Sequence, residues 1–361
     1  MRSLLIVTHV DFWRKGAGHR SRLTSLIGYI KLYFDITIVY AGTFDSRDGQ
    51  IFNREFPSIA IVSLEPRRTI TFKEHSILFA KFIADKKFDI ALIEYIEMAF
   101  VLPMLAKNVF TILDTHDLVA DRIKSFRDNG VQYSGIFMSE EEELDIFNCF
   151  DRVLLITKED HQKIGRQAGF DRAMFVPHAP VLRKRPIRDH VRNVGFVGSE
   201  YLPNVEAVRW FIKNIWPSIA HPLELNVYGR VCGRTLVSAD RVKLHGFVDN
   251  IDIIYDNCDL IINPVKCGAG LKIKNIEALA CGLPLITTSH GAVGIEAGRD
   301  DCFLVADTPA DFIKAISKLA DDLNHRKQLA ANAYAFAEMN FSPSACYQSL
   351  VNCMLEYQLT E

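Results

Sequence analysis

The chain has 361 residues, of which 49% are hydrophobic, so it is long enough for two domains that each bury a core. Its formal net charge is -2 at pH 7, whereas a binder of nucleic acid or of a membrane surface profits from an excess of Lys and Arg. We therefore expect no nucleic-acid partner. A slight basic excess in residues 1–185 allows at most a weak peripheral membrane contact through the amino-terminal domain.

The eight cysteines form no C-x-x-C pair and no grouping with His at metal-ligand spacing. We interpret them as buried, reduced thiols and expect no metal site. The apolar run at residues 4–7 is too short for a signal-peptide core, and no stretch reaches the apolar length that a membrane span needs. These features predict a cytoplasmic protein, with any membrane contact peripheral and at the inner face.

Short β-branched runs alternate with longer helical patterns through the first half of the chain. Ser139 and Glu142 have the spacing of a capping box, with Ser139 as the N-cap of a helix. The alternation predicts βαβ units around a parallel sheet. Strands are expected at residues 3–8, 36–40, 59–64, 90–93, 110–114, 152–157 and 174–176, and helices at residues 21–33 and 76–85.

Prolines interrupt all periodicity at residues 177–186, and this segment is the best linker in the sequence. Beyond it the alternation resumes. Strands are expected at residues 193–198, 223–228, 242–245, 260–263 and 285–288, and helices at residues 204–215 and 274–281.

The two series predict an α/β protein with two Rossmann-like, doubly wound domains that face a cleft. We expect an amino-terminal domain at residues 1–185, a carboxyl-terminal domain at residues 186–340, and a last helix in residues 341–361 that crosses back to the first domain. Open parallel sheets bind ligands at the carboxyl ends of their strands. The cleft is therefore the expected site.

Two candidate site segments follow predicted strands of the first domain. Gly16 and Gly18 precede the first helix, where glycines let a ligand approach the backbone and the helix offers free N–H groups to an anion. Their spacing is not that of a dinucleotide or P-loop fingerprint, so a structural turn remains the alternative. His116 follows a strand and lies between Asp114 and Asp117, and polar residues at a strand end favour a site over a core role.

The strongest candidate segment is residues 264–284, where a glycine loop follows a strand and leads into a helix. Backbone N–H groups of such a loop and the helix N-terminus suit phosphates, ammonium groups neutralise their charge, and a carboxylate accepts hydrogen bonds from ribose hydroxyls. The alternative, in which the charged side chains are solvated surface, leaves the glycines unexplained. The groups concerned are Gly268, Ala269, Gly270, Lys272, Lys274 and Glu277.

At these residues the sequence resembles the retaining glycosyltransferases of family 4, which have the GT-B fold. The resemblance covers nearly the whole chain and is best from about residue 193 to residue 297. It is carried by Phe196-Val197-Gly198-Ser199, by Pro203-Asn204, and by Glu277-Ala278-Leu279-Ala280-Cys281-Gly282-Leu283-Pro284. The last of these motifs is specific.

The resemblance implies a nucleotide-sugar donor in the carboxyl-terminal domain, a glycan, lipid-linked or other hydroxyl acceptor in the amino-terminal domain, and no obligatory metal or other cofactor. It places Glu277 on the ribose, His116 beside the transferring sugar, and Lys272 on the leaving diphosphate. The activity implied is transfer of a hexose or related sugar in the synthesis of a surface polysaccharide or glycoconjugate. The remaining donor-binding residues are Gly16, Gly18, Gly198, Arg230, Gly268, Ala269, Gly270 and Lys274.

Two departures from the family pattern leave alternatives open. Many members have a second Glu on the donor sugar where this chain has Ala269, and many have basic residues in the turn that here contains Gly198. Lys272, Lys274 or Arg230 must then neutralise the diphosphate. A nucleotide-sugar epimerase of the same fold and a non-catalytic sugar-nucleotide-binding module remain rivals, whereas a dehydrogenase would need a glycine spacing that the sequence lacks.

Overall fold

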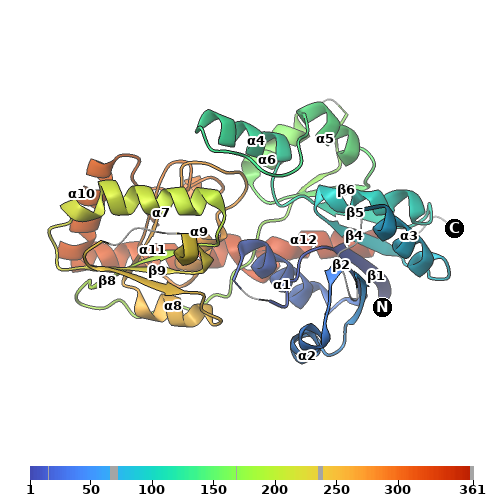
Figure 1. The fold of residues 1–361 in the computed structure, drawn as a ribbon, viewed down its shortest axis with the longest axis horizontal. Coiled ribbons are helices and arrows are strands. Elements are labelled where there is room, and N and C mark those ends of the chain that lie inside the picture. The colour runs from blue at the N-terminus through green and yellow to red at the C-terminus, as the bar shows by residue number, and fades with distance from the viewer. Residues whose placement is uncertain (15, 66–71, 168, 235–238, 358–361) are drawn as a thin grey trace.

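The computed structural model describes residues 1–14, 16–65, 72–167, 169–234 and 239–357. Its elements form two α/β domains that stand side by side along the longest axis of the molecule (Figure 1). Each domain is built around one parallel sheet, as the alternation of strands and helices predicted.

The amino-terminal domain contains a seven-stranded sheet with the order β3-β2-β1-β4-β5-β6-β7, in which every pairing is parallel. Its strands are β1 (Arg2–Thr8), β2 (Phe34–Thr43), β3 (Ala60–Glu65), β4 (Ile90–Glu94), β5 (Phe110–Asp114), β6 (Arg152–Leu155) and β7 (Ala173–Phe175). Its helices are α1 (Gly18–Ile30), α2 (Ser46–Glu55), α3 (Phe72–Ile83), the 3-10 helix η1 (Ile96–Met104), α4 (Val119–Asp128), α5 (Glu140–Phe147) and α6 (Lys158–Gly165).

The carboxyl-terminal domain contains a six-stranded parallel sheet with the order β10-β9-β8-β11-β12-β13. Its strands are β8 (Asn193–Val197), β9 (Glu224–Tyr228), β10 (Val242–Gly246), β11 (Leu260–Asn263), β12 (Leu285–Thr287) and β13 (Leu304–Val305). Its helices are α7 (Leu202–Asn214), α8 (Ile251–Asn257), α9 (Ile273–Ala280), α10 (Pro309–Asp321) and α11 (Leu323–Phe341), with the 3-10 helices η2 (Trp216–Ser218), η3 (Arg230–Arg234) and η4 (Glu296–Gly298).

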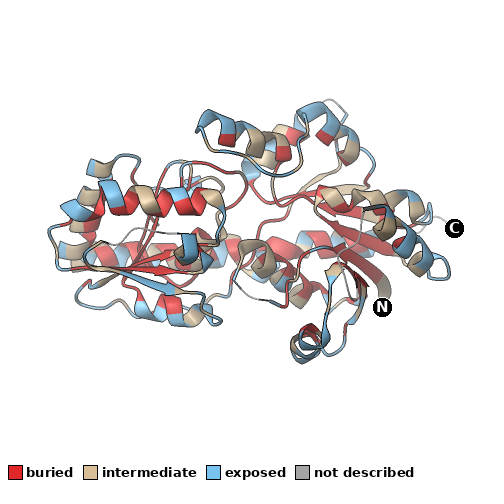
Figure 2. Ribbon diagram, in the orientation of Figure 1, coloured by how far each residue is buried: buried red, intermediate tan, exposed pale blue. Residues whose placement is uncertain are grey.

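Both sheets are buried at their centres, as the band of buried residues through each domain shows (Figure 2). The central strands β1, β4 and β11 are apolar on both faces because helices cover both faces of a parallel sheet. Strand order reverses between β1 and β4 in the first sheet and between β8 and β11 in the second. Ligands of doubly wound folds bind at such switch points. The loops that follow β1, β8 and β11 carry most of the candidate residues, whereas His116 follows β5 and Arg230 follows β9.

Two connections join the domains. In the linker, the backbone N–H groups of Arg183 and Arg185 already donate to carbonyls of the carboxyl-terminal domain, at Ala280 and Cys281. The second connection is α12 (Pro343–Glu356), which leaves α11 and runs against the first domain (Figure 1). There Tyr29 donates to Gln348 at 2.6 Å, so the last helix belongs structurally to the amino-terminal domain.

The start of one helix was predicted accurately from its cap, whereas the capped helices α2 and α10 were not predicted. Ser139 and Glu142 form both halves of the expected capping box at the start of α5. The first helix, by contrast, begins at Gly18 and ends at Ile30, three residues earlier at each end than expected. All eight cysteines are free, but the expectation that they are buried is wrong for Cys149, which is exposed, and Cys232 and Cys353 are only partly buried. No helix in the described ranges has the length and apolar character required to cross a membrane.

Candidate active site

The two domains are in contact where the glycine loop of the carboxyl-terminal domain approaches the end of β5. A Cβ atom added to Gly270 would lie 2.7 Å from the carbonyl oxygen of His116 and 3.0 Å from Cβ of Asp117. Next to it, the N–H of Gly268 donates to the hydroxyl of Ser125 on α4 at 3.0 Å. Gly268 and Gly270 both have positive φ, at 108° and 67°, which is the region that favours glycine.

A second contact between the domains involves the loop after β1. Gly16 has a φ of 99° and lies so close to the ring of Phe247 that no Cβ atom would fit between them. Gly18, the first residue of α1, lies against Ile273 of α9, with 3.1 Å between its added Cβ and the nearest side-chain atom. Lys15 of the same segment lies outside the described residues. Both predicted glycines thus face the glycine-loop domain across the cleft.

Lys272 follows the glycine loop and serves as the N-cap residue of α9. Its ammonium group donates to the carbonyl oxygens of Gly270 at 2.8 Å and of Ala269 at 3.4 Å, so it holds the loop in its folded shape. Burial lowers the pKa of Lys272 to about 8, although Asp117 across the cleft favours the charged form. A nearby phosphate would supply the negative charge that this ammonium lacks.

Lys274 lies in the first turn of α9 and points into the protein, not along the helix surface that was one alternative for it. Its ammonium group donates to Oδ1 of Asn204 at 2.6 Å and lies 4.6 Å from the centre of the Phe196 ring. Burial, and then the like charge of Lys272, lower the pKa of Lys274 to about 7. The Pro-Asn helix start and the lysine pair therefore belong to one site.

Glu277 is held by a tyrosine from a neighbouring helix. The hydroxyl of Tyr255, on α8, donates to Oε2 of Glu277 at 2.9 Å. Burial raises the pKa of Glu277 to about 7, against the opposing effects of the Tyr255 hydrogen bond and of Lys274. Sequence reasoning missed Tyr255, since nothing in its local pattern shows that α8 packs beside the start of α9.

Gly198 follows β8 at the switch point of the second sheet, and the turn that follows β9 packs closely against it. Its N–H donates to the carbonyl of Tyr228 at 3.0 Å, and Gly229 packs directly on its carbonyl oxygen, with a φ of 99° and no space for a side chain. Arg230 follows and places its guanidinium 5.5 Å from the ring of Phe247. Arg230 is exposed, whereas Lys272 and Lys274 are partly buried.

His116 is the candidate on the amino-terminal wall of the cleft, which is formed by the ends of β4 and β5. The geometry of His116 is unusual. It has a φ of 62°, its ring stacks on that of Tyr95 with centres 4.0 Å apart, and its Nε2 lies 2.6 Å from Oε2 of Glu94. A non-glycine residue rarely adopts positive φ, and such strain concentrates at functional sites. Glu94 was not among the expected site residues.

Beneath His116 lies a fully buried ion pair between Arg22 of α1 and Asp114 of β5. The guanidinium donates to both carboxylate oxygens at 2.8 Å. Glu94, Asp114 and His116 each offer a ligand atom within 4.8 Å of the others, a metal-like grouping that the sequence did not reveal because its members come from separate strand ends. A cation there would compete with the Arg22 guanidinium for Asp114 and would be repelled by it.

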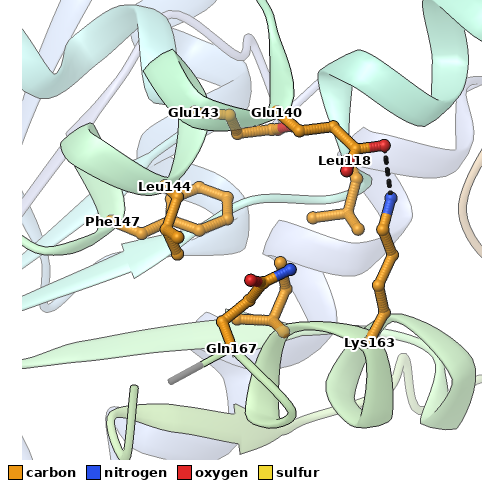
Figure 3. Close-up of a pocket in the computed structure, with 8 residues that line it drawn as sticks. Leu118, Glu140, Glu143, Leu144, Phe147, Lys163 and Gln167 are labelled. Carbon is orange, nitrogen blue, oxygen red and sulfur yellow. Dashed lines mark hydrogen bonds and ion pairs between the residues drawn. The ribbon is translucent and has the colours of Figure 1, made fainter. Parts of the chain in front are cut away.

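Two pockets lie near these site residues. The larger has a volume of about 400 Å³ and lies between the loop after α4, including Asn129 and Gln132, and the face of α7 with Glu206 and Trp210. Lys266, just before the glycine loop, completes it with an ammonium 3.5 Å from the centre of the Trp210 ring. The other, of about 20 Å³, lies between α5 and α6 and contains no expected site residue (Figure 3).

Comparisons with known proteins bear on the family and the fold of the chain. Residues 191–322 match the family described as Glycosyl transferases group 1. The carboxyl-terminal domain is therefore a glycosyl transferases group 1 domain. Over 302 residues, 74% of each chain, the protein is 23% identical to an uncharacterised 44.6 kDa protein in the cps region of Klebsiella pneumoniae.

Two solved glycosyltransferase-like structures resemble the whole chain. Sucrose-phosphate synthase from Thermosynechococcus elongatus superposes with a TM-score of 0.75 at 13% identity, over 98% of this chain and 99% of that one. Anabaena HepE, solved with UDP and glucose, gives a TM-score of 0.70 at 14% identity, over 99% and 100%. The GT-B fold expected from the sequence is confirmed.

The contact between Gly270 and His116 leads to a prediction on how the domains fit. Gly270→Ala should open the contact, because the new methyl group would meet the His116 carbonyl, and relieving such overpacking costs about 1–3 kcal/mol. We expect a lower unfolding temperature and a larger radius of gyration by X-ray scattering. Gly169→Ala is the control, since Gly169 has a φ of 80° but open space around it. Equal unfolding temperatures for the two variants would contradict the proposed close contact.

Proposed function

We propose that the protein is a retaining, metal-independent glycosyltransferase that moves a sugar from a nucleotide-sugar donor to a hydroxyl acceptor. One observation carries the proposal: Lys272, Lys274 and Glu277 lie together behind a glycine loop whose Gly270 contacts the amino-terminal domain, in a domain of the glycosyl transferases group 1 type. Two ammonium groups beside a glycine loop and a helix N-terminus suit a diphosphate, and a carboxylate suits a ribose.

The acid–base state of the site supports a charged ligand. Without one, burial draws the pKa values of Lys274 and Glu277 to about 7 from opposite sides, so neither charge is well compensated. A bound diphosphate stabilises the ammonium groups. As the donor bond breaks, the nucleotide gains negative charge, so Lys272 stabilises the transition state more than the ground state.

The acceptor is proposed to enter the 400 Å³ pocket beside the glycine loop. Both domains line this pocket, and its mixture of an indole ring, amide groups and charged groups suits a sugar, which has apolar C–H faces and polar hydroxyls. The resemblance to a protein of a cps region favours an acceptor from surface-polysaccharide synthesis, as a glycan or a lipid-linked sugar. The retaining outcome is proposed from the family 4 motif that contains Glu277.

The proposal is tested by acceptor-dependent release of nucleotide from UDP-, GDP- and ADP-sugars, with UDP-glucose first because HepE was solved with UDP and glucose. We expect the product to keep the donor's anomeric configuration by NMR, turnover to survive EDTA, and Lys272→Ala to lower kcat about 100- to 1000-fold. Lys213→Ala, an exposed change on α7, is the control. Turnover of the nucleotide-sugar without acceptor would favour the epimerase. Binding of the nucleotide-sugar without turnover would favour the non-catalytic module, and loss of turnover in EDTA would show a metal requirement.

UDP-glucose affinity should depend on pH with a maximum near neutrality. Glu277 must be ionised to accept ribose hydroxyls, so affinity falls as pH drops below about 7; Lys274 must be protonated to hold phosphate, so affinity also falls as pH rises above about 7. In Lys274→Arg the positive charge persists at alkaline pH. The fall in affinity on the alkaline side should then move to about pH 8, where Lys272 loses its proton. Calorimetry between pH 6 and 9 measures this; a flat profile would remove these groups from the donor site.

A bulky residue in the acceptor pocket should lower the rate of sugar transfer without weakening donor binding. Glu206 lies on the pocket rim with 51% of its side chain exposed, so Glu206→Trp adds bulk there with little effect on the core. We expect acceptor-dependent nucleotide release to fall at least about tenfold while UDP-glucose affinity stays within about twofold, since the donor groups lie elsewhere. Lys213→Trp, on the same helix and outside the pocket lining, should behave as wild type. Unchanged transfer in Glu206→Trp would move the acceptor to another surface.

A further inference from the structure

A buried carboxylate on the amino-terminal wall has no role in the assignments above. Glu94 is the last residue of β4 and pairs in register with Asp114 of β5, so both carboxylates lie at the same edge of the sheet, beside its switch point. Its side chain is completely buried, and its Oε2 lies 2.6 Å from Nε2 of His116. A carboxylate is seldom buried unless it has a specific partner, and His116 is that partner.

Two neighbouring side chains hold the imidazole of His116, one at a ring nitrogen and one against a face of the ring. Glu94 binds the Nε2 edge, and the ring of Tyr95, 8° from parallel, covers one face. Tyr95 and His116 both have positive φ, at 69° and 62°, although neither is glycine. The backbone is thus bent after two adjacent strands in a way that brings these rings together. With Nε2 turned toward Glu94, Nδ1 is the ring nitrogen left for a ligand in the cleft.

We propose that Glu94 is the positioning residue of His116: it holds Nε2, and the proton that the two side chains share decides whether Nδ1 donates a hydrogen bond to the bound sugar or accepts one. The inference rests on the proposed role of His116 in sugar transfer. When the pair carries one proton, that proton lies on Nε2 and Nδ1 accepts. When the pair carries a second proton, Nδ1–H donates.

The surroundings favour a shared proton over two separated charges. Burial, and then the negative charge of Asp114, raise the pKa of Glu94, while Arg22 acts in the opposite direction. Arg22 is committed to both oxygens of Asp114 and does not bond Glu94 directly. The other titratable groups that face the pair from the packed elements are His9, His19, Asp117 and His178.

Two of these neighbours are uncharged near neutral pH. Burial lowers the pKa of His19 and of His178 to about 3 each, so neither competes with His116 for a proton. Oε1 of Glu94 and Nη1 of Arg22 are buried and have no hydrogen-bond partner among the residues that the structure describes. Glu94 is therefore held through Oε2, by its contact with His116.

The experiment uses the full chain with Glu94→Gln, which keeps the shape of Glu94 but not its charge. In wild type, ¹⁵N-histidine spectra should show one tautomer for neutral His116, with the proton on Nε2; in the variant both tautomers should appear. The His116 signal is assigned from His116→Gln. With UDP-glucose and acceptor, kcat should fall about 10- to 100-fold, KM for the donor should stay within about threefold, and the acid limb of the kcat profile should shift.

Controls separate a positioning role from a structural one. Asp89→Asn makes the same chemical change just before β4 begins, where Asp89 binds Ser3, and should keep the wild-type kcat and His116 tautomer. Glu94→Asp keeps the charge but withdraws it by one methylene, and should lose activity as Glu94→Gln does. An unchanged His116 tautomer in Glu94→Gln, or wild-type kcat in either Glu94 variant, would overturn the inference. Unchanged turnover in His116→Gln would instead refute the proposed role of His116.

Discussion

The approach of the Gly270 backbone to the His116 carbonyl is the contact on which the rest of the site depends. A Cβ atom added to Gly270 would lie only 2.7 Å from that oxygen, so the backbones of the two domains are in contact here. This contact brings the loop held by Lys272 against the strand ends that carry His116 and Glu94. A larger residue at this point would separate the walls before any ligand arrived, and transfer between sites on different domains needs them to be close.

Burial then gives the assembled groups their chemical character. Lys272, Lys274 and Glu277 are partly buried, and burial shifts the pKa of each toward the value that favours its neutral form, to about 8, 7 and 7. Their internal partners are carbonyl oxygens, an amide and a phenol, none of which carries a full opposite charge. Such a site is electrostatically incomplete until an anionic ligand binds, which makes ligand affinity sensitive to pH.

The two walls differ in how their geometry arises. On the carboxyl-terminal wall, a contiguous run from the glycine loop to Glu277 supplies most of the candidate groups, with a loop and helix start that suit phosphate. On the amino-terminal wall, Arg22, Glu94 and His116 come from α1, the end of β4 and the turn after β5. Their grouping depends on the strand order β1-β4-β5 and on two strained residues, Tyr95 and His116. This wall is assembled by topology.

The sequence by itself predicted the fold class and the positions of nearly all strands along the chain, and it indicated the linker and the candidate segment at residues 264–284, because hydrophobic periodicity, proline breaks and glycine loops are local signals. It did not show the order of the strands within each sheet or the partners of the site residues, and it missed helices such as α2 and α10, although both begin with a capping box. Tyr255 on Glu277, Asn204 on Lys274 and Glu94 on His116 lie 22, 70 and 22 residues apart along the chain. Only the tertiary structure decided those pairs, because strand order and helix packing bring distant residues together, and burial then sets their charge.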